Sequence, residues 1–157
     1  MIEVKGDLWD YYGKPNYVIC VTTNACVSVT GRAVMGRGVA LQARERILNI
    51  DRELGWQIQN RGSGVEIFYL DDGRVLSFPT KIDWKLPSSI ELIKYSASNL
   101  NCIALNNPET TYVLPRPGCQ NGGLKWEDVK KIVDFLPDNV WIINKEYGRS
   151  SQDNPNA

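Results

Sequence analysis

The chain has 157 residues and a formal net charge of zero, with 18 basic and 18 acidic side chains, and 43% of it is hydrophobic. These values are typical of one soluble globular domain with its own core. They argue against a broad positive surface for binding nucleic acid, but they do not exclude a small basic cleft. The absence of histidine excludes imidazole-dependent mechanisms and histidine-ligated zinc sites. No apolar stretch approaches the roughly 20 residues of a membrane span.

Periodicity and turn residues predict strands that alternate with helices. In the first half the expected elements are a strand at 2–5, a loop at 10–16, a strand at 17–22, a loop at 23–37, helices at 39–50 and about 52–60, and a hairpin of strands 65–70 and 74–78 around an Asp-Gly turn. In the second half they are a helix capped by Ser88 or Ser89, a strand at 110–114, a Gly-rich loop, a helix at 125–136 and a strand at 140–143. This alternation predicts an α/β fold of three layers with a central mixed, largely parallel sheet.

Two Gly-rich loops each follow an apolar strand and precede a helix. The first runs from Asn24 to Gly38 and the second from Pro117 to Leu124. Glycine lets the backbone approach a ligand closely, and a helix start offers unpaired N–H groups and a positive dipole end that suit phosphate. Because ligands of such folds bind beyond the carboxyl ends of the strands, we expect both loops at one edge of the sheet with a diphosphate between them. The alternative for each loop is turn formation only.

The cysteines and the composition of the C-terminal residues predict the redox state and the extent of the domain. Cys20, Cys26, Cys102 and Cys119 have no Cys-x-x-Cys spacing, so we expect reduced thiols in the cytoplasm and neither disulfides nor a metal site. Residues 1–149 are expected to form one domain, and the polar residues 150–157 a flexible C-terminal tail. We expect a monomer that needs no metal and no cofactor and makes no membrane contact.

The motifs in this order resemble those of the macro domains, which are α/β/α modules that bind ADP-ribose. The resemblance covers nearly the whole chain and rests on Gly6-Asp7-Leu8, Asn24, residues 34–40, residues 118–124 and Ile142-Ile143-Asn144. Three segments are similar to the branch of DNA ADP-ribosyl glycohydrolase antitoxins and terminal ADP-ribose glycohydrolases, namely Met35 to Ala40, Phe78-Pro79-Thr80-Lys81 and Gly118 to Trp126. The resemblance implies the three-layer fold and ADP-ribose as the ligand.

The resemblance also implies how the ligand is held. Asp7 would accept a hydrogen bond from the adenine amino group and the backbone of Leu8 would read the ring, whereas the alternative for Asp7 is a helix or turn cap. Asn144 would lie near the adenosine, and Asn24 would bind the distal ribose. The first loop would hold the distal ribose and a phosphate through Met35, Gly36, Arg37, Gly38 and Val39. The second would hold the diphosphate through Pro117, Gly118, Cys119, Gln120, Asn121, Gly122, Gly123 and Leu124.

Lys81 and Asn24 are the implied catalytic residues. Lys81 follows Phe78-Pro79 at a strand end and resembles the lysine that related hydrolases use on the distal ribose, whereas the alternative is a solvated lysine. Attack on the anomeric carbon would form a covalent sugar–lysine adduct that water then resolves. Cys119 is a nucleophile by residue type, but we expect a structural role because no basic partner is evident.

Two departures from the family bear on activity. The terminal glycohydrolases have an acidic residue where this chain has Gly122, and the segment Ala25 to Ala33 is a long insert that we expect to shape the distal pocket. The expected function is the removal of ADP-ribose from a modified macromolecule. A DNA base is the favoured site of attachment, and protein is the alternative. Contact with DNA is expected to be transient. The alternatives are a non-catalytic binder of ADP-ribose or a related NAD-derived nucleotide, and a phosphatase of ADP-ribose 1″-phosphate.

Overall fold

A computed structural model describes residues 1–145, so the tail predicted at 150–157 lies outside the described residues. Its core is a six-stranded sheet in the order β1-β6-β5-β2-β4-β3. The parallel strands are β1 (Ile2–Lys5), β2 (Tyr17–Asn24), β4 (Val75–Lys81), β5 (Thr111–Pro115) and β6 (Val140–Asn144). The short strand β3 (Tyr69–Leu70) is antiparallel to β4. This sheet confirms the predicted mixed, largely parallel arrangement.

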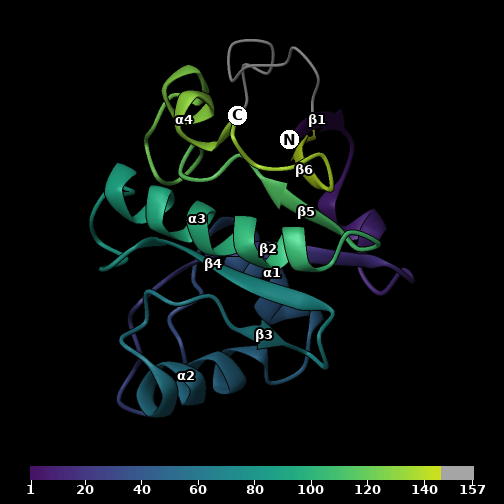
Figure 1. Cartoon of the computed structure of the whole chain (residues 1–157). Helices are drawn as coiled ribbons and strands as arrows, with labels where there is room; N and C mark the ends of the chain where they lie inside the picture. The colour runs from purple at the N-terminus through teal and green to yellow at the C-terminus, as the bar shows by residue number, and fades with distance from the viewer. Residues whose placement is uncertain (146–157) are drawn as a thin grey trace.

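Helices cover both faces of the sheet and give three layers (Figure 1). Helices α3 (Ile90–Asn106) and α4 (Trp126–Val133) pack on one face, and helices α1 (Gly38–Arg46) and α2 (Ile50–Arg61) and the 3-10 helix η1 (Leu8–Tyr11) pack on the other. Strand β2 belongs to both cores, because Ile19 and Val21 point to one and Val18 and Cys20 to the other. Burial on both faces explains why this strand is a continuous apolar run in the sequence.

The helix predicted at 39–50 is wrong in its extent. The structure ends α1 at Arg46 and begins α2 at Ile50. Between them Asn49 has a φ of 62°, in the left-handed region, which a continuous α-helix does not contain. Ile47 and Ile50 are both buried in the same core, so the apolar spacing of one helix continues across the break and conceals it.

The predicted hairpin and the predicted loop at 10–16 also differ from the structure. Only Tyr69–Leu70 pairs with β4 as a strand, because the Glu66 carboxylate accepts hydrogen bonds from the backbone N–H groups of Ser63 and Gly64 and holds that segment as a turn. The 3-10 helix η1 was not predicted. It begins where the Asp7 carboxylate accepts a hydrogen bond from the Trp9 N–H at 3.0 Å.

Two further expectations concern the solvent and redox environment. All four cysteines are free thiols, as the sequence predicted. Within residues 1–145, no helix combines the length and the apolar character that crossing a bilayer requires.

Candidate ligand-binding site

The ends of three neighbouring strands border a cavity of about 310 Å³. The contributing residues are Thr22, Thr23 and Asn24 from β2, Thr80 and Lys81 from β4, and Pro115 with the following Arg116 from β5. From β2 the chain continues to α1 on one face of the sheet, whereas from β4 and β5 it continues to α3 and α4 on the other. The cavity therefore lies at a topological switch point, which is where open α/β sheets bind their ligands.

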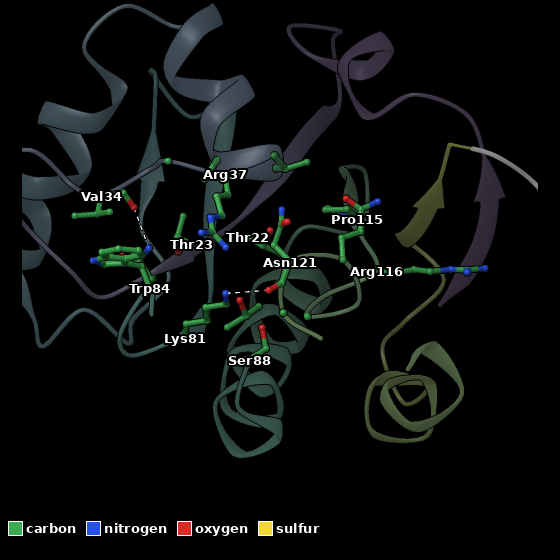
Figure 2. Close-up of a pocket in the computed structure, with 18 residues that line it drawn as sticks. Thr22, Thr23, Val34, Arg37, Lys81, Trp84, Ser88, Pro115, Arg116 and Asn121 are labelled. Carbon is green, nitrogen blue, oxygen red and sulfur yellow. Dashed lines mark hydrogen bonds between the residues drawn. The ribbon is translucent and has the colours of Figure 1, made fainter. Parts of the chain in front are cut away.

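Both Gly-rich loops border this cavity, as predicted. The lining residues are Gly36, Arg37 and Val39 from the first loop and Gly118, Gln120, Asn121 and Gly122 from the second. The loops also meet, because a Cβ at Gly38 would lie 2.7 Å from Asn121 Nδ2, and Gly38 has a φ of +56° that favours glycine. Figure 2 shows Arg37, Asn121 and Lys81 pointing toward one another across the space between the loops.

Four backbone N–H groups of the second loop have no hydrogen-bond partner in the described part of the chain. They belong to Gly118, Gln120, Asn121 and Gly122, the same four residues that line the cavity. The N–H groups of Cys119, Gly123 and Leu124, which do not line it, are bonded to carbonyls of residues 116–120. Unpaired N–H groups along a turn form a concavity that binds anions. The loop is thus divided into groups that maintain its shape and groups available to a ligand.

The charged side chains that line the cavity are all basic. They are Arg37, Lys81 and Arg116, and no acidic side chain within residues 1–145 joins them, although the whole chain has no net charge. The cavity also meets the start of helix α1, whose first turn has no acidic residue. The helix dipole, the N–H groups and the three cations all favour a negatively charged ligand.

Lys81 ends strand β4 opposite Asn24 in the register of the sheet. The register shifts at this point so that Thr80 has no partner residue on β2. Thr80 and Lys81, which adjoin this irregularity, both line the cavity. The ammonium group of Lys81 donates a hydrogen bond to the Asn121 carbonyl at 3.2 Å, which links β4 to the second loop (Figure 2).

Asn24 uses both ends of its side-chain amide within the protein. Its Nδ2 donates to the Val34 carbonyl at 3.0 Å, and its Oδ1 accepts from the Cys26 N–H at 2.9 Å. These bonds hold the first loop against the end of β2, and the side chain still borders the cavity. Asn24 therefore shapes the site, and its role toward a ribose stays a prediction.

A second cavity, of about 460 Å³, adjoins the first. It is lined by Glu3, Val4, Lys5, Arg116, Ile142 and Asn144. Arg116 borders both cavities, and its guanidinium carbon lies 5.1 Å from the centre of the Trp126 ring. We refer to these two cavities, which share Arg116 as a lining residue, as the groove. Asn144 lines the second cavity, and its place near an adenosine stays a prediction.

The other predicted ligand residues do not line either cavity, and they are Asp7, Leu8, Met35, Gly38, Pro117, Cys119, Gly123 and Leu124. Leu8 and Met35 are buried in the core because their side chains are apolar. Asp7 caps η1, which is the alternative that its position in the sequence allowed, and its other carboxylate oxygen lies 3.9 Å from Lys145 Nζ.

Cys119 has the structural character that the sequence suggested. Its side chain packs against the core beneath α3 and α4, and its thiol lies 3.4 Å from the Pro117 carbonyl. Burial raises the pKa of the Cys119 thiol to about 11. Because the thiolate is the nucleophilic form, this shift disfavours Cys119 as a nucleophile at neutral pH.

Three lining residues with functional chemistry were missed in the sequence: Trp84, Ser88 and Arg116. Arg116 follows the predicted strand at 110–114 directly, and this position could have indicated it. Ser88 was considered only as a helix cap, whereas Ser89 caps α3. Ser88 is 7% exposed, and its hydroxyl has no hydrogen-bond partner within residues 1–145.

The insert from Ala25 to Ala33 does not line either cavity, so the expectation that it shapes the distal pocket is wrong. It packs on helix α2 instead, where the Gly31 carbonyl lies 2.1 Å from the position of a Cβ at Gly55. The Arg32 guanidinium also pairs with the Asp51 carboxylate at 3.1 Å. Because a side chain at residue 55 would collide with the insert, Gly55 permits this close approach.

Comparison with known proteins relates this chain to one class of protein. No protein-family model matches the sequence. The macrodomain of Mycobacterium tuberculosis DarG superposes with a TM-score of 0.71 at 25% identity, and that of Thermus aquaticus DarG with 0.67 at 27%; each match covers 92% of this chain and 97% of the other. Thermosipho africanus DarTG in complex with ADP-ribose has the same fold, with a TM-score of 0.69 at 18% identity over 94% of this chain and 42% of that one. These superpositions show that the chain has the macro-domain fold.

Within that class the chain is similar to the DarG macrodomains, which confirms the likeness seen in the sequence. It is 33% identical over 106 residues to a Thermus aquaticus protein named DNA ADP-ribosyl glycohydrolase, a match that covers 62% of this chain and 29% of that protein. It is 28% identical over 128 residues to the Mycobacterium tuberculosis protein of the same name, covering 76% of this chain and 36% of the relative. The chain thus spans about a third of the length of these curated relatives.

Proposed function

We propose that this chain binds ADP-ribose in the groove and hydrolyses the bond that joins ADP-ribose to a modified macromolecule, with a DNA base as the favoured attachment. The observation that carries this is the set of four unpaired N–H groups on residues that line a cavity whose charged side chains are all basic. A diphosphate matches such a site in charge and in its many acceptor oxygens. The name DNA ADP-ribosyl glycohydrolase of the curated relatives supports the substrate class.

The shape of the groove orients this ligand. The diphosphate would lie against the N–H groups of Gly118, Gln120, Asn121 and Gly122. The adenosine would extend past Arg116 into the second cavity toward Asn144, with Asp7 and the Leu8 backbone as its predicted partners. The distal ribose would then point the other way, toward Asn24 and Lys81. This direction brings the anomeric carbon, where the macromolecule is attached, to the end of strand β4.

Lys81 supplies the chemistry in this proposal. In its neutral form the Lys81 amine attacks the anomeric carbon, a new C–N bond forms, and the bond to the base breaks with its electron pair. The departing base takes up a proton, and the lysine nitrogen gives up one. Water then attacks the same carbon, the sugar–lysine bond breaks, and free ADP-ribose and Lys81 are regenerated. The described lining holds no carboxylate that could take this role, and a hydroxyl there would need a general base that the lining does not supply, which supports Lys81 as the nucleophile.

Two other possible functions of the site have less support from its lining residues. Hydrolysis of ADP-ribose 1″-phosphate usually needs a general base, and neither a histidine nor an acidic side chain lines the described cavity. A purely binding module would need no reactive group at the distal end, where Lys81 borders the cavity. We further propose that the protein is a cytoplasmic monomer. Its contact with DNA would be transient because the chain has no net charge.

The experiment that tests this function measures the release of free ADP-ribose by mass spectrometry. The substrates are a single-stranded oligonucleotide with ADP-ribose on one base and a peptide with ADP-ribose on a glutamate. We expect release from the oligonucleotide at a rate that depends on enzyme concentration. Binding of ADP-ribose without release from either substrate would leave only the binding module.

Replacing Ser88 by alanine is expected to lower the affinity for ADP-ribose without lowering stability. Ser88 borders the cavity, and its buried hydroxyl has no hydrogen-bond partner in the described structure, so we expect a phosphate oxygen of the bound ligand to become its acceptor. A hydrogen bond to a charged group contributes about 1.5–3 kcal/mol, which corresponds to a loss of affinity of about 10- to 150-fold. Calorimetric titration and a thermal melt of Ser88→Ala measure the two quantities.

The matched control for this variant is Ser96→Ala. Ser96 is fully buried, and its hydroxyl donates a hydrogen bond to the Pro79 carbonyl at 2.7 Å, so its loss should lower the free energy of unfolding by about 1–3 kcal/mol and leave the affinity for ADP-ribose unchanged. Equal affinities of Ser88→Ala and the wild type would show that Ser88 does not contact the ligand.

Replacing Cys119 by alanine is expected to leave the rate of ADP-ribose release within about twofold of the wild type. Burial raises the pKa of the Cys119 thiol to about 11, so the thiolate that a nucleophile requires is scarce at pH 7–8. A hundredfold loss of turnover with intact binding would instead assign the nucleophile to Cys119.

A further inference from the structure

One exposed tryptophan borders the cavity at the end where the macromolecule would be attached. Trp84 lies in the segment between β4 and α3, three residues after Lys81, and it is 42% exposed. Of the five tryptophans in the chain, it alone lines either of the two cavities. Its neighbours Ile82 and Leu86 are also exposed, so this segment presents apolar side chains beside a basic cavity.

The position of Trp84 is opposite to that of Arg116. Figure 2 shows Trp84 beside Val34 at one end of the cavity, Lys81 and Asn121 in the middle, and Pro115 and Arg116 at the other end. The second cavity adjoins at the Arg116 end. A ligand whose adenosine occupies the second cavity therefore has its distal ribose near Lys81, and the group attached to that ribose projects toward Trp84.

We propose that Trp84 stacks on the nucleobase attached to the distal ribose and is the residue that selects a single-stranded nucleic acid as the substrate. This rests on the proposed function. An indole ring offers a flat apolar surface, and bases stack on such surfaces whatever their sequence. A base inside a duplex is covered by its neighbours, so a base that is already unpaired reaches the ring at lower cost. An aliphatic glutamate side chain has no flat face to stack in this way.

The state of the indole ring agrees with a role in binding. Within residues 1–145 the Trp84 N–H makes no hydrogen bond, whereas the indoles of Trp9 and Trp126 donate to Gln42 and Glu3. The ring is therefore not fixed by a bond that a substrate would have to break. Lys85 Nζ lies 5.6 Å from the ring centre.

A matched control for Trp84 exists on helix α2. Trp56 is 52% exposed and has a cation beside its ring, the Arg61 guanidinium at 5.5 Å. It lines neither cavity. Replacing Trp56 by alanine therefore removes an equally exposed indole in a similar setting, and we expect it to change neither binding nor turnover.

The test compares two ligands in the Lys81→Ala background, which prevents cleavage. One is free ADP-ribose, and the other is a single-stranded oligonucleotide with ADP-ribose on one base. We expect Trp84→Ala to lower the affinity for the oligonucleotide by about 5- to 150-fold, the range for the loss of one stacked base. The affinity for free ADP-ribose should fall by less than twofold. Trp84→Phe should restore most of the affinity. Equal weakening of both ligands, or no weakening of the oligonucleotide, would overturn the assignment.

Turnover separates this assignment from the proposed function. If the wild type releases ADP-ribose from the oligonucleotide and Trp84→Ala has the same kcat/KM, the function stands and the role of Trp84 fails. If the wild type releases none but the selective loss of binding is seen, the role of Trp84 stands and the hydrolase fails. A loss of kcat/KM for the ADP-ribosylated peptide as large as that for the oligonucleotide would also overturn the selection of nucleic acid.

Discussion

Replacing Lys81 by alanine is expected to abolish turnover and to preserve the binding of ADP-ribose. The rate of release should fall by about 10²- to 10⁴-fold, the range for the loss of one positioned catalytic group, because Lys81 is the only amine among the charged lining residues of the described cavity, the other two being arginines. Affinity should fall only modestly, since in the proposed orientation the phosphates lie against the backbone N–H groups of the second loop and Arg37 and Arg116 still supply positive charge. Single-turnover release and calorimetric titration of the same protein measure both quantities.

Lys81→Arg separates the chemistry from the structure. Lys81 also donates a hydrogen bond to the Asn121 carbonyl, so alanine removes a link to the second loop as well as an amine. Arginine can restore the donor but stays protonated and cannot attack. We expect Lys81→Arg to be as inactive as alanine, and restored turnover would assign Lys81 to positioning the loop. Lys94→Ala, an exposed lysine on α3, is the control for the loss of a positive charge.

Replacing Gly36 by leucine is expected to block the groove without unfolding the protein. Gly36 lines the cavity and is exposed, and a Cβ built there has no atom within 4 Å. A leucine side chain therefore enters the space that the ligand needs and disturbs no packing in the free protein. Overpacking costs about 1–3 kcal/mol, which predicts a loss of ADP-ribose affinity of about 5- to 150-fold. The free energy of unfolding should stay within about 0.5 kcal/mol of the wild type.

The size series at this position provides the control. Gly36→Ala adds only the Cβ, which meets open space, so its affinity should remain close to that of the wild type. A progressive loss from alanine to leucine, with unchanged thermal melts, would locate the ligand over Gly36. An unchanged affinity of the leucine variant would mean that the ligand binds elsewhere.

The position of the site could be predicted from the sequence because it depends on chain order. Apolar strands followed by Gly-rich loops and helices imply a parallel sheet with both loops beyond its carboxyl edge. The meeting of Gly38 with Asn121 and the shared cavity confirm that inference. The resemblance to macro domains and the fold class are confirmed in the same way by the DarG macrodomains.

The lining of the site could be predicted only in part, because side-chain direction depends on local geometry that a pattern does not contain. Consecutive residues at the strand ends, such as Thr80 and Lys81, both line the cavity, and the alternation of side chains along a strand would not predict this. Motif spacing also did not distinguish Gln120 and Asn121, whose N–H groups are unpaired in the described chain, from Gly123, whose N–H bonds to the Gln120 carbonyl. Trp84 belongs to none of the motifs, and its role follows only from its place at the cavity.

Calorimetric titration of the purified protein with ADP-ribose tests the central claim most directly. The four unpaired N–H groups and the three basic side chains predict a dissociation constant in the micromolar range or below, which is a binding free energy of about −8 kcal/mol or more favourable. The absence of binding at millimolar ADP-ribose would contradict the claim, because the groove would then be shaped for another ligand.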